Sequence, residues 1–225
     1  MKDITEKYLS SLFELDSDLK KLKQLGIANE VPIIRDITAQ FLSTFVKITR
    51  PKTILEIGTG VGYSGTVILK SVPDAKFVGV ELDSVLVDVA RHNLNKYDAT
   101  VLLGDCRKVV PDLLHHRKCD LKSSEENNNR LYNLPDYYDL IFMDGPKSAY
   151  NQLLDDFISL LSPNGVLVCD NVLYNGRVAD LDSNQKVSTI VRNLREFLKK
   201  INQAPFKSTV LDVGDGISLT TKMNN

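Results

Sequence analysis

Two carboxylates and an amide directly follow two apolar runs in the second half of the chain. Asp144 comes after the run 140–143, and Asp170 and Asn171 come after the run 166–169. If both runs are parallel strands of one sheet, these side chains reach the same edge of it. Their oxygens form the hard ligand set that Mg²⁺ or a similar divalent cation prefers. The pattern predicts a metal site; alternatively, Asp144 caps a helix and Asp170 and Asn171 start a turn.

A glycine-rich turn follows an earlier apolar run, 53–57, and lets a ligand approach backbone amides at the start of a helix. A dinucleotide fingerprint needs glycine where this chain has Tyr63. Glu56 would oppose a pyrophosphate, but it could lie beside the ammonium group of a methionine moiety. The turn therefore favours S-adenosylmethionine over NAD. Its predicted cofactor contacts are Gly58, Thr59, Gly60, Tyr63 and Ser64.

Two further apolar runs end in acidic residues that suit an adenosine. Glu81 stands at the tip of the second run, where its carboxylate could accept hydrogen bonds from both ribose hydroxyls. The third run ends at Asp105 and Cys106, in a turn suited to an adenine edge. Either acidic residue could instead be a helix cap. Together with the glycine-rich turn after the first run, these two strand ends make three successive signatures, and their order favours cofactor binding.

Lys147 follows Asp144 by three residues, and we expect it on the first turn of the next helix. Its ammonium could then reach an oxygen bound to the predicted metal. The metal would lower the pKa of a hydroxyl and orient it for attack on a sulfonium methyl, while Lys147 accepts or stabilises the leaving proton. Asp144 and Lys147 are therefore the candidate catalytic residues, and an ordinary solvated lysine is the alternative.

A sheet is needed to hold these residues at one edge. After Pro51, short apolar runs alternate with amphipathic helix-length segments, which is typical of βαβ units. The predicted parallel strands are 53–57, 77–80, 100–103, 140–143 and 166–169. The predicted helices lie near 63–71, 84–96, 107–115, 147–161 and 186–202. Runs 208–213 and 216–221 predict a terminal hairpin. The expected fold is α/β, a Rossmann-like doubly wound sheet of seven strands with helices on both faces.

The remaining segments complete one predicted domain over residues 1–225. Helical spacing of apolar residues runs from Ile4 to Leu25 and predicts a helix that stops at Gly26. A second N-terminal helix is expected at 36–49. The stretch 117–135 is polar and compositionally biased, so we expect a surface insertion there, which could be mobile.

Composition narrows the range of partners. Lys and Arg number 28 against 29 Asp and Glu, so the formal net charge is −1 and no global charge attracts nucleic acid or an anionic membrane. The three cysteines have no C-x-x-C spacing, which indicates a reducing compartment. We find no pattern of a signal peptide or a membrane span, and we expect a cytoplasmic protein.

Together these motifs resemble those of the cation-dependent class I O-methyltransferases, the group that contains caffeoyl-CoA and catechol O-methyltransferases. The matching segments are 31–34 (VPII), 55–64 (LEIGTGVGYS), 144–147 (DGPK), 170–178 (DNVLYNGRV) and 213–216 (VGDG). The resemblance implies a homodimer and metal ligation by Asp144, Asp170 and Asn171. It implies cofactor contacts from Ile34, Glu56, Gly58, Ser64, Glu81, Cys106 and Asp144. The chain departs from many relatives at Gly145–Pro146 and in the length of its insertion.

Within this group, the short N-terminal arm, the VPII segment ahead of the second helix and the VGDG ending look most like the bacterial branch that methylates 5-hydroxyuridine at the tRNA wobble position. A 5-hydroxyl beside a carbonyl offers a cation the same two oxygens as a catechol, so a small catechol-like or caffeoyl-CoA-like acceptor is the alternative. The candidate phosphate contacts are Arg177, Lys20, Lys21, Lys23, Arg192, Arg195, Lys199 and Lys200, which could equally be solvated helix faces. An NAD-dependent oxidoreductase and a non-catalytic binding module are the other classes considered.

Overall fold

The computed structural model describes residues 2–118, 134–180 and 188–223, which contain a mixed seven-stranded sheet in the order β3-β2-β1-β4-β5-β7-β6. The parallel strands are β1 (Thr53–Ile57), β2 (Lys76–Glu81), β3 (Ala99–Leu103), β4 (Tyr138–Met143) and β5 (Leu161–Cys169). The antiparallel hairpin consists of β6 (Phe206–Leu211) and β7 (Ile217–Lys222). The predicted fold is confirmed. Strand order reverses between β1 and β4, where ligands bind in doubly wound sheets.

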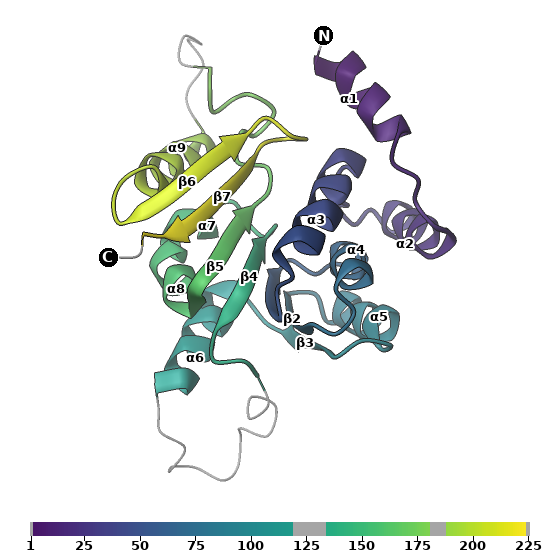
Figure 1. Cartoon of the computed structure of the whole chain (residues 1–225), viewed down its shortest axis with the longest axis horizontal. Coiled ribbons are helices and arrows are strands. Elements are labelled where there is room, and N and C mark those ends of the chain that lie inside the picture. The colour runs from purple at the N-terminus through teal and green to yellow at the C-terminus, as the bar shows by residue number, and fades with distance from the viewer. Residues whose placement is uncertain (1, 119–133, 181–187, 224–225) are drawn as a thin grey trace.

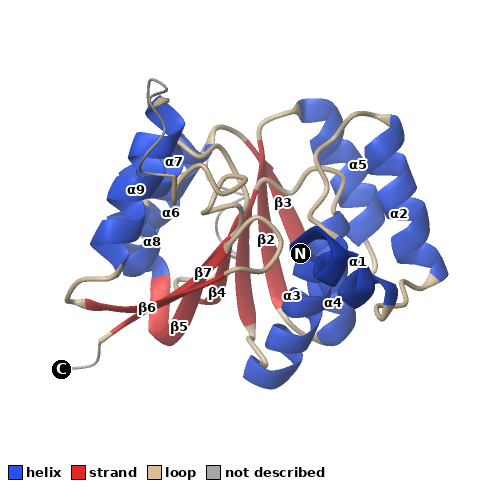
Figure 2. Cartoon of the chain, turned by 90° about the horizontal axis from the view of Figure 1, so that it is seen from above, coloured by secondary structure: helices blue, strands red, loops and turns tan. Residues whose placement is uncertain are grey.

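Helices cover both faces of the sheet (Figures 1 and 2). On one side lie α1 (Lys2–Ser11), α2 (Ser17–Ala28), α3 (Asp36–Thr49), α4 (Tyr63–Ser71) and α5 (Ser84–Leu94). On the other side lie α6 (Cys106–Lys118), α7 (Ala149–Gln152), α8 (Leu154–Leu160) and α9 (Thr189–Ile201). No helix among the described residues is long and apolar enough to cross a membrane.

Each face of the sheet has its own buried core, because successive residues of a strand point to opposite faces. In β1, Leu55 and Ile57 join the core beneath α6 and α8, and Ile54 joins the core beneath α3 and α4. Glu56 alternates with Leu55 and therefore points to the same face as Ile54, with no exposed surface. A carboxyl group is thus buried at the sheet interior next to the glycine-rich turn.

The prediction of one helix from Ile4 to Leu25 was wrong. The chain leaves helical conformation after Ser11, and Asp16 starts α2 by accepting hydrogen bonds from the backbone amides of Asp18 and Leu19. This capping favours a new helix over continuation of the first. Gly26 lies inside α2 and is not its stop. A Cβ there would lie 2.3 Å from a side-chain carbon of Ile33, so packing accounts for the glycine.

The segments 147–161 and 212–216 also differ from their predicted boundaries. The segment 147–161 forms two short helices, α7 and α8, and Leu161 already belongs to β5. Lys147 lies in the turn before α7, so it is not on the first helical turn. The connection between β6 and β7 spans 212–216 and is longer than the predicted Gly214–Asp215 turn. The predicted insertion, 117–135, lies mostly outside the described residues.

Candidate functional site

The carboxyl ends of β1, β4 and β5 bring the predicted metal-binding residues to one edge of the sheet. The Asp144 amide donates to the Ile57 carbonyl at 3.0 Å, and the Asp170 amide donates to the Met143 carbonyl at 3.0 Å. Asp144 and Asp170 therefore each continue a parallel ladder by one residue, on adjacent strands that lie about 4.8 Å apart. Asn171 comes next, with a left-handed φ of 56°.

The Lys147 ammonium joins these strand ends. Its Nζ donates to Asp144 Oδ1 at 3.2 Å, to Asn171 Oδ1 at 2.8 Å and to the Tyr150 hydroxyl at 2.9 Å. An ammonium group has three hydrogens, and three acceptors surround this one. The side chain is only 16% exposed, which argues against an ordinary solvated lysine.

Negative charge is crowded at this edge. Burial raises the pKa of Asp144, and the Lys147 ammonium opposes the shift. Burial also raises the pKa of Asp170, and the nearby charge of Asp144 raises it further. Such a pair favours a bound cation, because a cation compensates buried carboxylates. Among the described residues, no three His, Cys, Asp or Glu side chains group to hold a metal, so the candidate set is two carboxylates and one amide.

Tyr150 links the two strands to Lys147 and was missed by the sequence reasoning. Its hydroxyl is hydrogen-bonded to the Met143 carbonyl at 3.0 Å and to the Asp170 carbonyl at 2.8 Å, and it accepts from Lys147. The ring is 1% exposed and packs edge-on against Phe197 of α9. The only sequence signal was its position three residues after Lys147. Tyr150 therefore fixes the position of the ammonium relative to the ends of β4 and β5.

We expect Tyr150→Phe to lower kcat about tenfold, because Lys147 loses one of its three acceptors. The free energy of unfolding should fall by about 1–3 kcal/mol, because the Asp170 carbonyl loses a buried donor. Steady-state kinetics and urea unfolding measure the two effects. Tyr8→Phe is the matched control, since Tyr8 is 64% exposed on α1. Unchanged kinetics in Tyr150→Phe would show that the hydroxyl does not position Lys147.

The glycine-rich turn is held by the end of β2. The Gly58 amide donates to the Val80 carbonyl at 2.9 Å, and the Gly60 amide donates to Glu81 Oε2 at 2.8 Å. Glu81 Oε1 accepts from the amides of Leu82 and Asp83. The helix cap of α5 is Asp83 and not Glu81. Glu81 thus already shapes the turn from which the adenosine would be bound.

Two hollows lie on either side of this turn and share Gly58. The larger, about 170 Å³, is lined by Ile57, Gly58, Val80, Glu81, Leu82, Gly104, Asp105, Cys106, Arg107 and Pro146. The smaller, about 20 Å³, is lined by Pro32, Ile33, Ile34, Gly58, Thr59, Gly60, Val61, Tyr63, Ser64 and Asp144. Except for Glu56, every predicted cofactor residue lines one of them. Sequence reasoning did not single out the other lining residues, such as Arg107 and Pro146, although Arg107 directly follows Cys106 and Pro146 lies within the segment 144–147.

Asp105 combines the two roles that the sequence left open. Its carboxylate lines the larger hollow and also accepts from the Arg107 amide at 2.9 Å, as a helix cap would. This amide, together with the Arg107 guanidinium at 3.1 Å, lowers the pKa of Asp105. The carboxylate is therefore fixed in its ionised form at the rim of the hollow.

Gly58 leaves no room for a side chain beside Asp144. Its φ is +88°, and a Cβ at this position would lie 2.6 Å from the Asp144 carbonyl oxygen. The turn can therefore approach the end of β4 only with glycine here. This close approach places the predicted cofactor turn directly against the predicted metal ligand.

Glu56 lies beneath the turn with neither carboxyl oxygen hydrogen-bonded. Burial raises its pKa to about 8, and the charges of Asp144 and Glu81 contribute; the hydroxyls of Ser64 and Thr59 oppose the shift without reaching hydrogen-bonding geometry. A buried carboxyl without a partner is costly unless a ligand supplies one. A cationic group in the adjoining hollow would supply it.

The raised pKa of Glu56 predicts how stability depends on pH. The folded chain retains this proton up to about pH 8, whereas the unfolded chain loses it near pH 4.5. The contribution of Glu56 to stability is therefore complete below pH 4.5 and lost as pH rises through 8. Glu56→Gln should abolish this decline in urea unfolding of the cofactor-free protein, and Glu14→Gln on the surface should retain it. An unaltered pH profile in Glu56→Gln would contradict the assignment.

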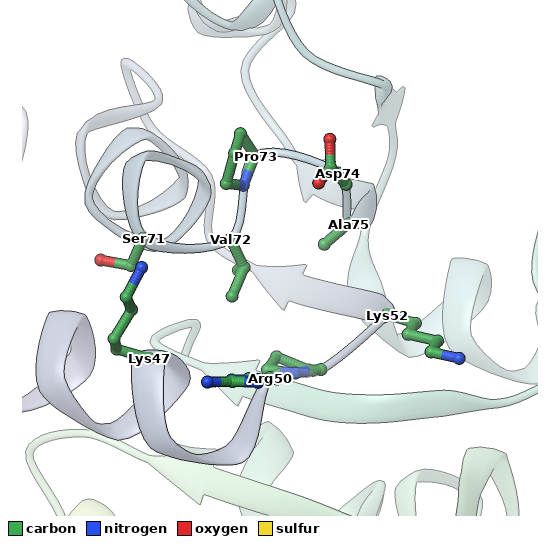
Figure 3. A pocket seen from close by; sticks show the side chains of 9 residues that line it. Lys47, Arg50, Lys52, Ser71, Val72, Pro73, Asp74 and Ala75 are labelled. Atoms are coloured by element: carbon green, nitrogen blue, oxygen red, sulfur yellow. The ribbon is translucent and has the colours of Figure 1, made fainter.

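A larger hollow, about 310 Å³, lies at the opposite edge of the sheet between the C-terminal ends of α3 and α4. Lys47, Arg50 and Lys52 lie around it, and Figure 3 shows that the Arg50 and Lys52 side chains point away from one another. Cations at helix C-termini complement the partial negative charge of the last carbonyl groups. An anion here would meet two helix C-termini, so we do not place the functional site in this hollow.

The candidate phosphate contacts do not form one surface. Lys23 pairs with Asp36, Lys200 pairs with Asp155, and Arg195 donates to backbone carbonyls, including that of Val178 at 2.9 Å. The lysines of α2 and the basic residues of α9 lie on opposite sides of the sheet (Figure 2). Helix-face solvation and local pairing therefore explain most of these charges better than a continuous nucleic-acid surface.

Comparison with known proteins identifies the family. The O-methyltransferase family model matches residues 9–223. A probable caffeoyl-CoA O-methyltransferase 1 of Dictyostelium discoideum is 22% identical over 222 residues, covering 95% of this chain and 87% of that protein. A catechol O-methyltransferase of Niastella koreensis is 26% identical over 186 residues, covering 79% and 76%.

Solved structures share the fold. An O-methyltransferase from Bacillus cereus in complex with SAH superposes with a TM-score of 0.78 at 23% identity, covering 99% of this chain and 100% of that one. TomG from Streptomyces achromogenes, in complex with SAM, gives 0.77 at 21% identity, covering 98% and 96%. The family match over most of the length, together with the arrangement of the strand ends, shows that this chain belongs to the O-methyltransferase family.

Proposed function

We propose that this protein transfers a methyl group from S-adenosylmethionine to a hydroxyl oxygen with the help of a divalent cation. The observation that carries the proposal is the position of Lys147 Nζ, within 3.2 Å of Asp144 and 2.8 Å of Asn171, beside the glycine-rich turn. Family membership makes O-methyl transfer the expected chemistry. A proton-handling group, a cation ligand set and a cofactor turn converge at one edge.

Three features of the turn fit S-adenosylmethionine. Glu56 is a buried carboxyl group without a partner, which an ammonium group would neutralise. Gly58 lets the turn pack directly against the end of β4, so that the turn and Asp144 line the same hollow. Glu81 and Asp105 present carboxylates to the hollow of about 170 Å³ beside the turn. An adenosine bound there has hydroxyl and amino groups that could donate hydrogen bonds to them. When bound, this cofactor supplies an electrophilic methyl group on a sulfonium.

The proposed cation ligands are Asp144, Asp170 and Asn171. Their oxygens match the preference of Mg²⁺, and the raised pKa values of both carboxyls reflect negative charge that a cation would balance. When bound, the cation lowers the pKa of the acceptor hydroxyl and orients it. Asp170 is 1% exposed and Asp144 partly exposed, so the proposed ligand set opens towards the side of the smaller hollow.

Lys147 is the group that we propose handles the proton of the acceptor. Its Nζ lies against two of the three proposed ligand side chains and is fixed by Tyr150. As the neutral amine it can receive that proton, and as the ammonium it can stabilise the oxyanion that remains, with little movement in either case. Positioning and charge supply the rest of the catalysis. Asp144 serves both as cation ligand and as the acceptor that orients Lys147.

The acceptor class that this chemistry fits best has two adjacent oxygens on one ring, as in a catechol. Relatives named for caffeoyl-CoA and for catechol support a small aromatic acceptor. A 5-hydroxyuridine in tRNA presents the same oxygen pair and remains the second candidate. The observation in its favour is the exposed Arg177, in the loop after Asn171, which could contact a phosphate. The dispersed basic residues of α2 and α9 favour the small acceptor.

Labelled S-adenosylmethionine and Mg²⁺ test the acceptor. We expect label to enter catechol but not resorcinol, whose hydroxyls are not adjacent. Label that enters only tRNA carrying 5-hydroxyuridine would replace the small acceptor with the nucleoside. Label in none of the three, from a protein that binds the cofactor, would refute the proposed acceptor class. We also propose a homodimer, which the resemblance to the family implies, and a reducing compartment, because Cys106 and Cys169, the cysteines among the described residues, are free thiols.

A further inference from the structure

The loop that carries Asn171 has an unusual backbone. Asn171, Tyr174 and Asn175 adopt positive φ values of 56°, 48° and 54° without being glycine. Residues that carry a side chain rarely adopt this backbone conformation, and it persists only where surrounding contacts hold the backbone in it. The loop therefore needs an external support to keep the Asn171 side chain beside Asp144 and Asp170.

The connection between β6 and β7 provides that support from about 40 residues further along the chain. The Leu173 amide donates to the Asp215 carbonyl at 3.0 Å, and the Val172 amide donates to the Gly216 carbonyl at 3.0 Å. The Asp215 carboxylate itself accepts from the Asn175 amide. One residue thus contacts the loop through both its backbone and its side chain, and Asp215 is only 9% exposed.

The same connection is packed closely against its neighbours at two glycines. A Cβ on Gly216 would lie 2.4 Å from Leu173 Cγ, and a Cβ on Gly214 would lie 2.6 Å from Thr38 Oγ1 of α3. Figure 1 shows the tip of the hairpin beside the start of α3. The connection therefore lies between α3 and the loop, and its contacts with both fix the position of the loop, including Asn171, relative to α3.

We propose that Asp215 is a positioning residue that holds the loop 171–176 so that Asn171 can act as a cation ligand. This inference rests on the proposed function. The Asp215 carboxylate satisfies the Asn175 amide, which fixes the left-handed backbone on the far side of Tyr174 and anchors the loop at both ends. Residues that orient metal ligands are commonly needed for affinity without touching the metal.

Two variants of the full chain separate the hydrogen bond from the charge. Asp215→Ala removes the acceptor, whereas Asp215→Asn removes the charge but keeps an oxygen that can accept from the Asn175 amide. Asp74→Ala, at the opposite edge of the sheet, is the control for loss of a carboxylate. Mn²⁺ and SAH are titrated separately by calorimetry. Hydrogen exchange of the Asn175 amide is followed in the metal-free protein.

We expect Asp215→Ala to weaken Mn²⁺ binding by about 10–100-fold, to leave SAH binding within about twofold, and to speed exchange of the Asn175 amide. Asp215→Asn should stay near wild type in all three. Wild-type behaviour of Asp215→Ala, or equal damage in Asp215→Asn, would overturn the proposal. If the wild-type protein binds no Mn²⁺, the proposed function fails, and unchanged Asn175 exchange in Asp215→Ala would still refute the anchoring.

Discussion

Asp170→Ala should lower kcat/KM by at least about 10³-fold, because it removes one of the two carboxylates that we propose hold the cation. The side chain is 1% exposed and lies at the end of β5, beside the other proposed carboxylate ligand on β4. Methyl transfer to the accepted substrate, measured with labelled cofactor, gives the effect. Asp170 lines neither hollow of the glycine-rich turn, so cofactor binding should persist.

The stability of the same variant distinguishes loss of function from loss of fold. In the metal-free protein, Asp144 and Asp170 repel one another, and burial opposes the ionised form of both. Removing Asp170 therefore also removes an unfavourable charge, and we expect little change in the free energy of unfolding. Asp98→Ala on the surface is the control. More than about a tenth of wild-type activity in Asp170→Ala would refute its role as a ligand.

Lys147→Met should lower kcat by about 10²–10⁴-fold, the usual contribution of a positioned proton-transfer group. Lys147→Arg should not restore it, because a guanidinium remains protonated and cannot accept a proton. KM for the cofactor should change little, since Lys147 lines neither hollow. Steady-state kinetics of both variants, with the exposed Lys199→Met as control, measure the effect.

The arginine variant decides what Lys147 does. If Lys147→Arg retains activity near that of wild type, positive charge alone suffices, and Lys147 stabilises charge without accepting a proton. If Lys147→Met is nearly as active as wild type, the residue has no part in the chemistry. Its three hydrogen bonds would then serve only to balance Asp144 in the folded protein.

The sequence was sufficient to predict which strand ends meet. Parallel strands place their carboxyl ends at one edge, so 140–143 and 166–169 as parallel strands of one sheet predicted that Asp144 and Asp170 reach the same edge. The structure adds that these two strands are neighbours. The O-methyltransferase family, inferred from the motifs, is confirmed by the family match. The homodimer, the cation and the tRNA acceptor stay predictions.

Contacts between distant segments could not be predicted in the same way. Tyr150 follows Lys147 closely in sequence, but its burial depends on Phe197, and Asp215 reaches Asn175 across the hairpin connection. Neither pairing has a periodic signature. The break before α2 was different, because Asp16 is a strong helix-capping residue and the longer apolar spacing obscured it.

The dependence of methyl transfer on a divalent cation is the most direct test of the account. Protein freed of metal with EDTA and then gel-filtered is assayed with labelled S-adenosylmethionine and its best acceptor, with and without Mg²⁺. We predict that transfer falls to about 1% or less without the cation and returns when Mg²⁺ is added. Undiminished transfer by the EDTA-treated protein would contradict the proposed roles of Asp144, Asp170 and Asn171.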